Sequence, residues 1–234
     1  MIDDFRRTNT HRMTHEQWTT VDRYITETLV PADPALVTAL QQSDQAGLPP
    51  IHVSPPQAKL LHLLARIRGA RTILEIGTLA GYSTIWLARA LPAGGRLITL
   101  EADPKHAEVA RANLARAGLA EVVELRLGLA LDTLPQIAAQ VGRPFDLIFI
   151  DADKANTPEY FTWALKLSGV GTLIIADNVV RNGALADSDS NDPNVRGMRR
   201  LHEMIANEPR VSATTIQTVG GKGYDGFTLA LVTA

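Results

Sequence analysis

Short apolar runs alternate with amphipathic segments along the chain between residues 72 and 177. A short apolar run followed by a segment with helical spacing is typical of a strand–helix unit. Successive units of this kind build parallel strands with helices on both faces, because each crossover is right-handed. The pattern therefore predicts an α/β fold with a doubly wound, mostly parallel sheet. We expect strands at 72–76, 96–101, 122–126, 145–151 and 171–177, separated by helices near 82–91, 105–117, 132–141 and 157–167.

The segment before the first strand carries signals for helix starts. Thr14 and Gln17 have the spacing of a capping box, in which each side chain bonds to the backbone of the other residue. At Asp33–Pro34 and Ser54–Pro55, a capping side chain stands directly before a proline. Three N-terminal helices are therefore expected.

Two further apolar stretches follow the parallel strands, near 211–218 and 226–232. The glycine-rich segment Gly220–Gly226 between them is short enough for the turn of a hairpin. We therefore expect a sheet of about seven strands that ends in an antiparallel pair.

Length and apolar content favour one domain. The chain has 234 residues, of which 45% are hydrophobic, enough for one sizeable core. We expect a single domain over 1–234, with a helical extension at 1–70 and an α/β core at 71–234. Residues 1 to about 13 are polar and unpatterned, and we expect them to be mobile.

Charge and cysteine content exclude several classes of function. The 23 Lys and Arg residues against 25 Asp and Glu give a net charge of -2, which disfavours nucleic acid or an anionic membrane as a partner. The chain has no cysteine, so disulfides, zinc–thiolate sites and cysteine nucleophiles are excluded. It shows neither a signal-peptide pattern nor about 18 consecutive apolar residues, and we expect a cytoplasmic protein.

A glycine-rich turn follows the first predicted strand. In the run from Glu75 to Ser83, Gly77 and Gly81 allow a tight turn and a close backbone approach before a helix N-terminus. Glu101 ends the next strand, 20 residues after Gly81, which is where an acid can accept hydrogen bonds from a ribose diol. The two features together predict a nucleoside-type cofactor, although the glycines alone could serve only to pack strand against helix.

Acidic and amide side chains end two later strands that we expect to be neighbours. Asp151 follows the fourth strand, and Asp177 and Asn178 follow the fifth. Carboxyl ends of parallel strands share one edge, so these oxygens should converge. Two close carboxylates repel each other unless a cation lies between them, and hard oxygen ligands favour Mg²⁺, with Ca²⁺ or Mn²⁺ as alternatives. The competing interpretation is that these acids only cap the following helices.

Lys154 lies three residues after Asp151, close enough to reach a ligand at such a cation site. A lysine beside a cation and partly buried can act as a general base. The ordinary alternative is a solvated surface lysine.

These runs together resemble the cation-dependent class I O-methyltransferases, which include the caffeoyl-CoA and catechol O-methyltransferases. The similarity covers about residues 50–234 and rests on the order and spacing of 74–84, 150–156 and 176–178. It implies a Rossmann-like methyltransferase fold, S-adenosylmethionine as cofactor and a divalent metal. It further implies an acceptor with two vicinal hydroxyls on an aromatic ring, and a homodimer.

The resemblance also implies roles for individual residues. Lys154 and Asp151 would be catalytic, with Lys154 as the base that takes the hydroxyl proton. Asn182 would contact the acceptor. The metal ligands would be Asp151, Asp177 and Asn178, and the cofactor contacts would be Val53, Glu75, Gly77, Thr78, Ser83, Glu101, Ala130 and Asp153.

Two other functions stay open on the residues alone. The enzyme could transfer a methyl group to nitrogen or another atom, with Asp151 and Asp177 orienting the acceptor without a metal. It could also bind the cofactor without catalysis. Within the family that it resembles, the run Asp151–Lys154 follows the pattern of the plant and bacterial enzymes, which favours bulky catechols as acceptors. The segment 181–194 matches no relative whose substrate is identified, so the acceptor itself stays open.

Overall fold

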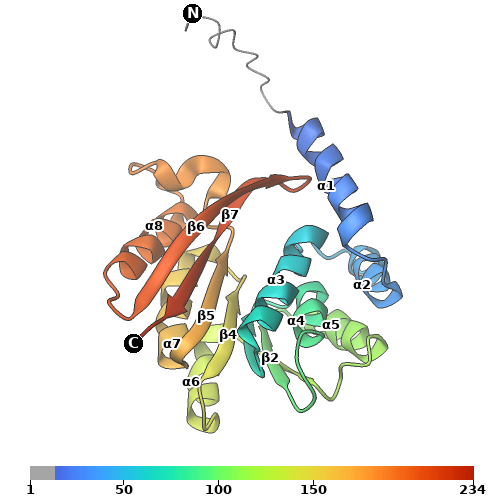
Figure 1. Cartoon of the computed structure of the whole chain (residues 1–234), viewed down its shortest axis with the longest axis horizontal. Helices are drawn as coiled ribbons and strands as arrows, with labels where there is room; N and C mark the ends of the chain where they lie inside the picture. The colour runs from blue at the N-terminus through green and yellow to red at the C-terminus, as the bar shows by residue number, and fades with distance from the viewer. Residues whose placement is uncertain (1–13) are drawn as a thin grey trace, which may run out of the picture.

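The computed structural model describes residues 14–234, so the expectation for residues 1–13 lies outside the described residues. The described residues form a seven-stranded sheet in the order β3-β2-β1-β4-β5-β7-β6 (Figure 1). The first five strands pair in parallel, whereas β7 runs antiparallel to both β5 and β6. The predicted fold class is therefore confirmed. The strands are β1 (Thr72–Ile76), β2 (Arg96–Glu101), β3 (Val123–Leu127), β4 (Phe145–Ile150), β5 (Ser168–Asp177), β6 (Val211–Gly220) and β7 (Gly223–Val232).

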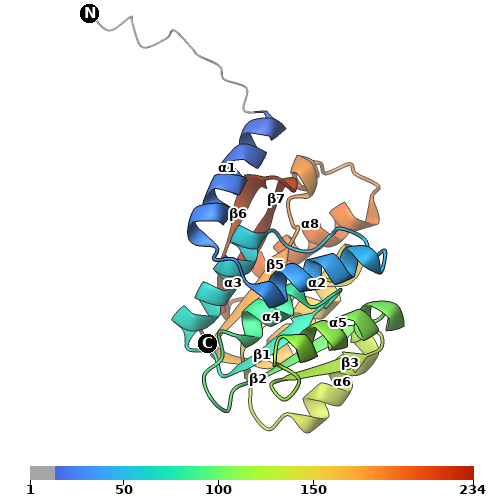
Figure 2. The same ribbon diagram turned by 90° about the vertical axis from the view of Figure 1, so that its right-hand side faces the viewer.

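Helices cover both faces of the sheet (Figure 2). The helices within residues 14–234 are α1 (His15–Leu29), α2 (Pro34–Gln45), α3 (Pro55–Arg68), α4 (Tyr82–Ala88), α5 (Pro104–Arg116), α6 (Ala130–Gln140), α7 (Thr157–Lys166) and α8 (Pro193–Ala206), with short 3-10 helices η1 (Lys154–Asn156) and η2 (Arg181–Ala186). One apolar core includes Leu61 of α3 and Ile85 of α4, and the other includes Leu134 of α6 and Phe161 of α7. None of the helices in this part of the chain is long and apolar enough to cross a membrane.

The predicted helix starts are confirmed. Thr14 Oγ1 accepts a hydrogen bond from Gln17 N at 3.3 Å, and Gln17 Oε1 accepts one from Thr14 N at 2.8 Å. Asp33 and Ser54 likewise accept hydrogen bonds from backbone N–H groups in the first turns of α2 and α3. Local capping chemistry therefore fixes where the N-terminal helices begin.

The final hairpin is tighter than the sequence suggested. We expected the whole segment 220–226 to form the turn, but only Gly221 and Lys222 separate the two strands. Gly226 lies inside β7, where an added Cβ would stand 2.4 Å from the carbonyl oxygen of Ile216. The predicted antiparallel pair is confirmed, but its turn was predicted too long because β6 continues to Gly220 and β7 begins at Gly223, and glycines in paired strands cannot be distinguished from turn glycines in a sequence.

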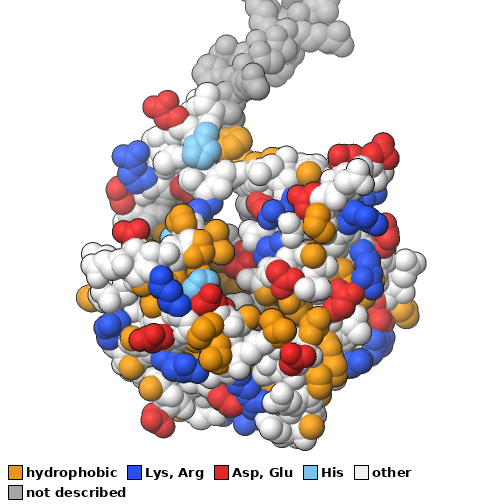
Figure 3. All heavy atoms as spheres, turned by 180° about the vertical axis from the view of Figure 1, so that it is seen from behind, with side chains coloured by type: hydrophobic (Ala, Val, Ile, Leu, Met, Phe, Trp, Pro, Cys, Tyr) orange, Lys and Arg blue, Asp and Glu red, His pale blue; other side chains and the backbone are white. Residues whose placement is uncertain are grey.

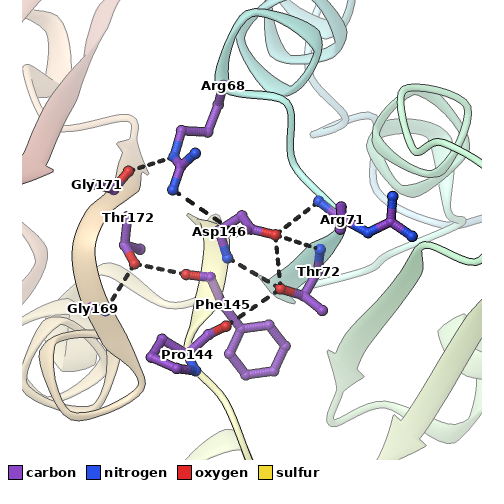
Figure 4. Close-up of polar contacts among 9 residues, drawn as sticks. All are labelled: Arg68, Arg71, Thr72, Pro144, Phe145, Asp146, Gly169, Gly171 and Thr172. Atoms are coloured by element: carbon purple, nitrogen blue, oxygen red, sulfur yellow. Dashed lines mark hydrogen bonds and ion pairs between the residues drawn. The ribbon is translucent and has the colours of Figure 1, made fainter.

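A polar cluster ties α3 to the starting ends of the strands, opposite their carboxyl ends (Figure 4). Asp146 Oδ2 accepts hydrogen bonds from Arg71 N at 2.8 Å, Thr72 N at 2.9 Å and Thr72 Oγ1 at 3.0 Å. Arg68 Nη2 lies 3.8 Å from Asp146 Oδ1, and Arg68 Nε donates to the carbonyl of Gly171 at 2.5 Å. Partial burial acts to raise the pKa of Asp146, but the hydrogen bonds from Arg71 and Thr72 hold it below its usual value.

Replacing Asp146 with Ala should lower the free energy of unfolding by about 1–3 kcal/mol, because its donors lose a charged acceptor. Since the folded-state pKa is lowered, this contribution is present at neutral pH and is lost as the pH falls through that folded-state pKa. Urea denaturation at pH 7 measures the difference, with Glu121→Ala at an exposed acid as the control. Equal stabilities of Asp146→Ala and the wild type would contradict this role.

Candidate functional site

A cavity of about 500 Å³ lies beyond the carboxyl ends of β1, β2 and β4. Seen from behind, the surface next to α1 is hollowed, and acidic side chains line part of the hollow (Figure 3). The cavity is lined by seven of the eight residues for which the sequence implied a cofactor contact. These are Val53, Gly77, Thr78, Ser83, Glu101, Ala130 and Asp153.

The turn after β1 depends on its glycines. Gly77 has a φ of 100°, and a Cβ there would lie 2.3 Å from the carbonyl oxygen of Asp151. Gly81, with a φ of 84°, stands at the N-terminus of α4. Any side chain at Gly77 would separate the ends of β1 and β4, so this glycine allows the turn and Asp151 to share one cavity wall.

Glu101 orders the same turn from the end of β2. Its Oε2 accepts hydrogen bonds from the backbone N–H groups of Thr78 at 3.3 Å and Leu79 at 2.8 Å, and its Oε1 accepts one from Asp103 N at 2.9 Å. The carboxylate also lines the cavity, and His106 Nδ1 lies 3.6 Å from Oε1. Glu101 can therefore fix the turn and still offer oxygen acceptors to a ligand.

Glu75 is the implied cofactor residue that the structure does not place on the cavity wall. Its carboxylate is fully buried and accepts hydrogen bonds from the hydroxyls of Ser83 at 2.7 Å, Thr84 at 2.5 Å and Thr99 at 2.7 Å. Burial raises the pKa of Glu75 to about 7, although the three hydroxyls act to lower it. Glu75 lies behind Ser83, and it acts on the cavity by orienting that hydroxyl.

The side chains expected at the cation site do converge. Lys154 Nζ donates to Asp151 Oδ1 at 2.7 Å, and both residues line the cavity. Asp177 is only 4% exposed, and its Oδ1 accepts a hydrogen bond from Asn178 N at 2.8 Å. Burial, together with the nearby charge of Asp151, raises the pKa of Asp177 to about 7, while Lys154 acts to lower it.

A second cavity, of about 320 Å³, adjoins the same edge of the sheet. Asn178, whose φ of 55° turns the chain sharply after β5, lines both cavities. Asp177 and Asn182 line the second cavity only, and Tyr224 and Phe227 contribute aromatic walls. The carboxylates and Asn178 thus stand at the border between a larger and a smaller space.

Two features of this group, its charge and its type of ligand atom, fit a hard divalent cation bound by Asp151, Asp177 and Asn178. The buried carboxylate of Asp177 and the partly buried carboxylate of Asp151 lie near a single ammonium, that of Lys154, so two negative charges share one positive partner. The ligand atoms are carboxylate and amide oxygens, as Mg²⁺ prefers. Among residues 14–234, no cluster of three or more His, Asp or Glu side chains could hold a metal ion, so the expected set needs the Asn178 oxygen to complete it.

Two residues at the site escaped the sequence analysis. Tyr160 lines the larger cavity, and its hydroxyl donates a hydrogen bond to Asp153 Oδ1, while Asn156 Nδ2 donates to Oδ2 at 2.6 Å. His106 lines the cavity beside Glu101. The start signal at Asp103–Pro104 could have identified His106, because it places this histidine in the first turn after β2.

Comparison with known proteins gives a consistent result. The family described as O-methyltransferase matches residues 27–232. A catechol O-methyltransferase of Niastella koreensis is 54% identical over 220 residues, covering 94% of this chain and all of the relative.

Solved structures agree with the sequence relatives. An O-methyltransferase of Bacillus cereus in complex with SAH is 60% identical, with a TM-score of 0.93 and coverage of 94% of this chain and 100% of that one. The O-methyltransferase TomG of Streptomyces achromogenes, in complex with SAM and involved in tomaymycin synthesis, is 56% identical, with a TM-score of 0.92 and coverage of 95% and 100%. This chain belongs to the O-methyltransferase family, and it is a methyltransferase enzyme.

Proposed function

We propose that this enzyme transfers a methyl group from S-adenosylmethionine to one hydroxyl of a catechol-like aromatic diol held by a divalent cation. One observation carries the proposal. Asp151, Lys154, Asp177 and Asn178 converge at the border of two adjoining cavities, and Asn178 lines both. A donor in the larger space and an acceptor in the smaller space would therefore meet at these side chains.

The larger cavity is suited to the cofactor. Its volume of about 500 Å³ lies within the range of small-molecule sites, and its wall combines apolar surface with a few fixed polar groups. Glu101 offers carboxylate oxygens for the ribose diol, and Ser83, oriented by Glu75, offers a hydroxyl for the methionine part. The SAH-bound relative from Bacillus cereus and the SAM-bound TomG support this assignment.

The smaller cavity is suited to an aromatic acceptor. Tyr224 and Phe227 supply aromatic walls, and Asn182 supplies an amide at the same space. Asp151, Asp177 and Asn178 would hold the cation, and their oxygens would orient the diol toward the larger cavity. The catechol O-methyltransferase from Niastella koreensis supports a diol as the acceptor.

When bound, the cofactor supplies an activated methyl group and the cation supplies positive charge that lowers the pKa of the acceptor hydroxyl. The hydroxyl proton passes to the Lys154 amine. Ser83 and Glu101 would hold the cofactor, which would supply its methyl group to this oxygen and would leave as the neutral thioether, with the electron pair of the broken carbon–sulfur bond on sulfur. In this structure Lys154 Nζ donates a hydrogen bond to Asp151 Oδ1 at 2.7 Å. Because Asp151 would also serve as a cation ligand, a bound cation would compete with Lys154 for this carboxylate.

Removing divalent metal should lower methyl transfer by roughly 100-fold or more, because the acceptor hydroxyl then ionises without a neighbouring cation. The measurement is monomethyl ether formation by mass spectrometry on a catechol panel, before and after EDTA treatment and after Mg²⁺ is restored. SAH affinity, measured by calorimetry in parallel, should change little. Turnover that is indifferent to chelation would remove the metal from the mechanism and favour the metal-independent alternative.

Replacing Lys154 with Met should lower kcat by roughly 100-fold or more, because the general base is lost. The Kd for SAH should stay within about twofold of the wild type, since Lys154 is assigned to the proton and not to the cofactor. Lys166→Met removes an exposed lysine that lies over the Trp163 ring, and it serves as the control. Parallel losses of kcat and SAH affinity would exclude Lys154 as the base.

Replacing Glu101 with Gln should raise the Kd for SAH by about tenfold to 100-fold, because an anionic acceptor for ribose hydroxyls and backbone N–H groups is lost. Calorimetric titration with SAH measures this directly. Glu108→Gln, at an exposed position on α5, is the matched control. An unchanged Kd would show that the ribose diol binds elsewhere.

A further inference from the structure

Helix α1 is held to the sheet by few contacts. None of residues 15–29 is buried, and Val21 and Tyr24 are 51% and 68% exposed. The helix lies beside the tip of the β6–β7 hairpin, as both ribbon views show (Figures 1 and 2). Because α1 buries so little apolar surface, the polar contact at this tip has a large share in fixing its position.

That contact joins one carboxylate to two glycines. Gly221 N donates a hydrogen bond to Asp22 Oδ2 at 2.7 Å. A Cβ added at Gly220 would lie 2.3 Å from the same oxygen, whereas one added at Gly221 would lie 3.7 Å away. A side chain at residue 220 would therefore displace the Asp22 carboxylate from the position in which it accepts the hydrogen bond of Gly221. We call Asp22, Gly220 and Gly221 the tip latch.

The tip latch is part of the wall of the smaller cavity. Asp22 and Gly220 line it together with Asp177 and Asn178, which stand at the proposed cation site. α1 and the hairpin tip thus both contribute residues to the wall of this cavity.

The hairpin tip also contacts the N-terminal side of the larger cavity. Lys222 Nζ donates a hydrogen bond to the carbonyl oxygen of Pro50 at 2.8 Å. The residues that follow, Ile51 to Val53, line the cofactor cavity. The hairpin tip therefore contacts the walls of both cavities. Lys222 contacts the segment before the larger cavity, and Asp22 holds the tip at the smaller cavity, which is proposed for the acceptor.

We propose that Asp22 is a positioning residue for the methyl acceptor. It fixes the hairpin tip as a wall of the smaller cavity, and it acts through Gly221 without taking part in the chemistry. The role assigned to the smaller cavity rests on the proposed function, whereas the tip latch itself is a property of the fold.

A double-mutant cycle tests the tip latch. Asp22→Ala removes the carboxylate, and Gly220→Ala pushes it away from Gly221 by steric contact. Each single variant should raise the KM for a catechol acceptor by about tenfold, while kcat and the Kd for SAH change by less than about twofold. The double variant should resemble Asp22→Ala alone, because the added methyl group then has no carboxylate to displace. Additive effects on KM would overturn the proposal.

Matched variants separate positioning from general loss of structure. Asp22→Asn keeps an oxygen acceptor for Gly221 N and should restore most of the acceptor affinity. Glu27→Ala, at an exposed acid on the same helix, should behave like the wild type. A raised KM in Glu27→Ala, or no rescue by Asp22→Asn, would overturn the assignment to Asp22.

Hydrogen exchange provides a readout that needs no activity. The Gly221 amide should exchange faster in Asp22→Ala and Gly220→Ala than in the wild type, with the amides of β4 unchanged. If the wild type methylated no diol, the proposed function would fail while the exchange result still tested the tip latch. Unchanged Gly221 exchange in both variants would show that the hydrogen bond does not hold the tip, and would overturn the inference.

Discussion

The close approach of Gly77 to the backbone of Asp151 is the constraint on which the site depends. Gly77 N donates to the carbonyl of Leu100 at 3.0 Å, and Asp151 N donates to the carbonyl of Ile76 at 2.8 Å, so the ladders on both sides of β1 continue to its last residue. A Cβ at Gly77 would stand 2.3 Å from the Asp151 oxygen and force these strand ends apart. Because Gly77 has no side chain, the glycine turn and Asp151, a proposed cation ligand, can both line the larger cavity.

Other polar contacts keep this edge fixed. Glu75 bonds three hydroxyls behind the turn, and Glu101 bonds three backbone N–H groups in front of it. Buried carboxylates with several donors hold one geometry, because any shift leaves a charged group unsatisfied. Glu75 and Glu101 therefore hold the wall of the larger cavity in one geometry, whereas Asp151 and Asp177 lie near the single ammonium of Lys154.

The sequence predicted what local chemistry and topology determine. Helix starts at Thr14, Asp33 and Ser54 depend on neighbouring residues, and the convergence of Asp151 with Asp177 follows from the order of parallel strands. The inward position of Glu75 was not predictable, because all five residues of β1 are buried and no alternation marks its two faces. Contacts between distant residues were also missed: Asp146 and Thr72 are 74 residues apart, and Asp22 and Gly221 are 199 apart.

The central claim is that Asp151, Asp177 and Asn178 form a divalent cation site at the border of the two cavities. Anomalous diffraction from crystals grown with SAH and Mn²⁺ tests it most directly, because near its absorption edge the ion scatters anomalously far more strongly than the protein atoms. We predict one peak within coordination distance of oxygens of all three side chains, with SAH in the larger cavity and Lys154 Nζ displaced from Asp151. Crystals with SAH bound but no peak there, and the Lys154–Asp151 ion pair intact, would contradict the account.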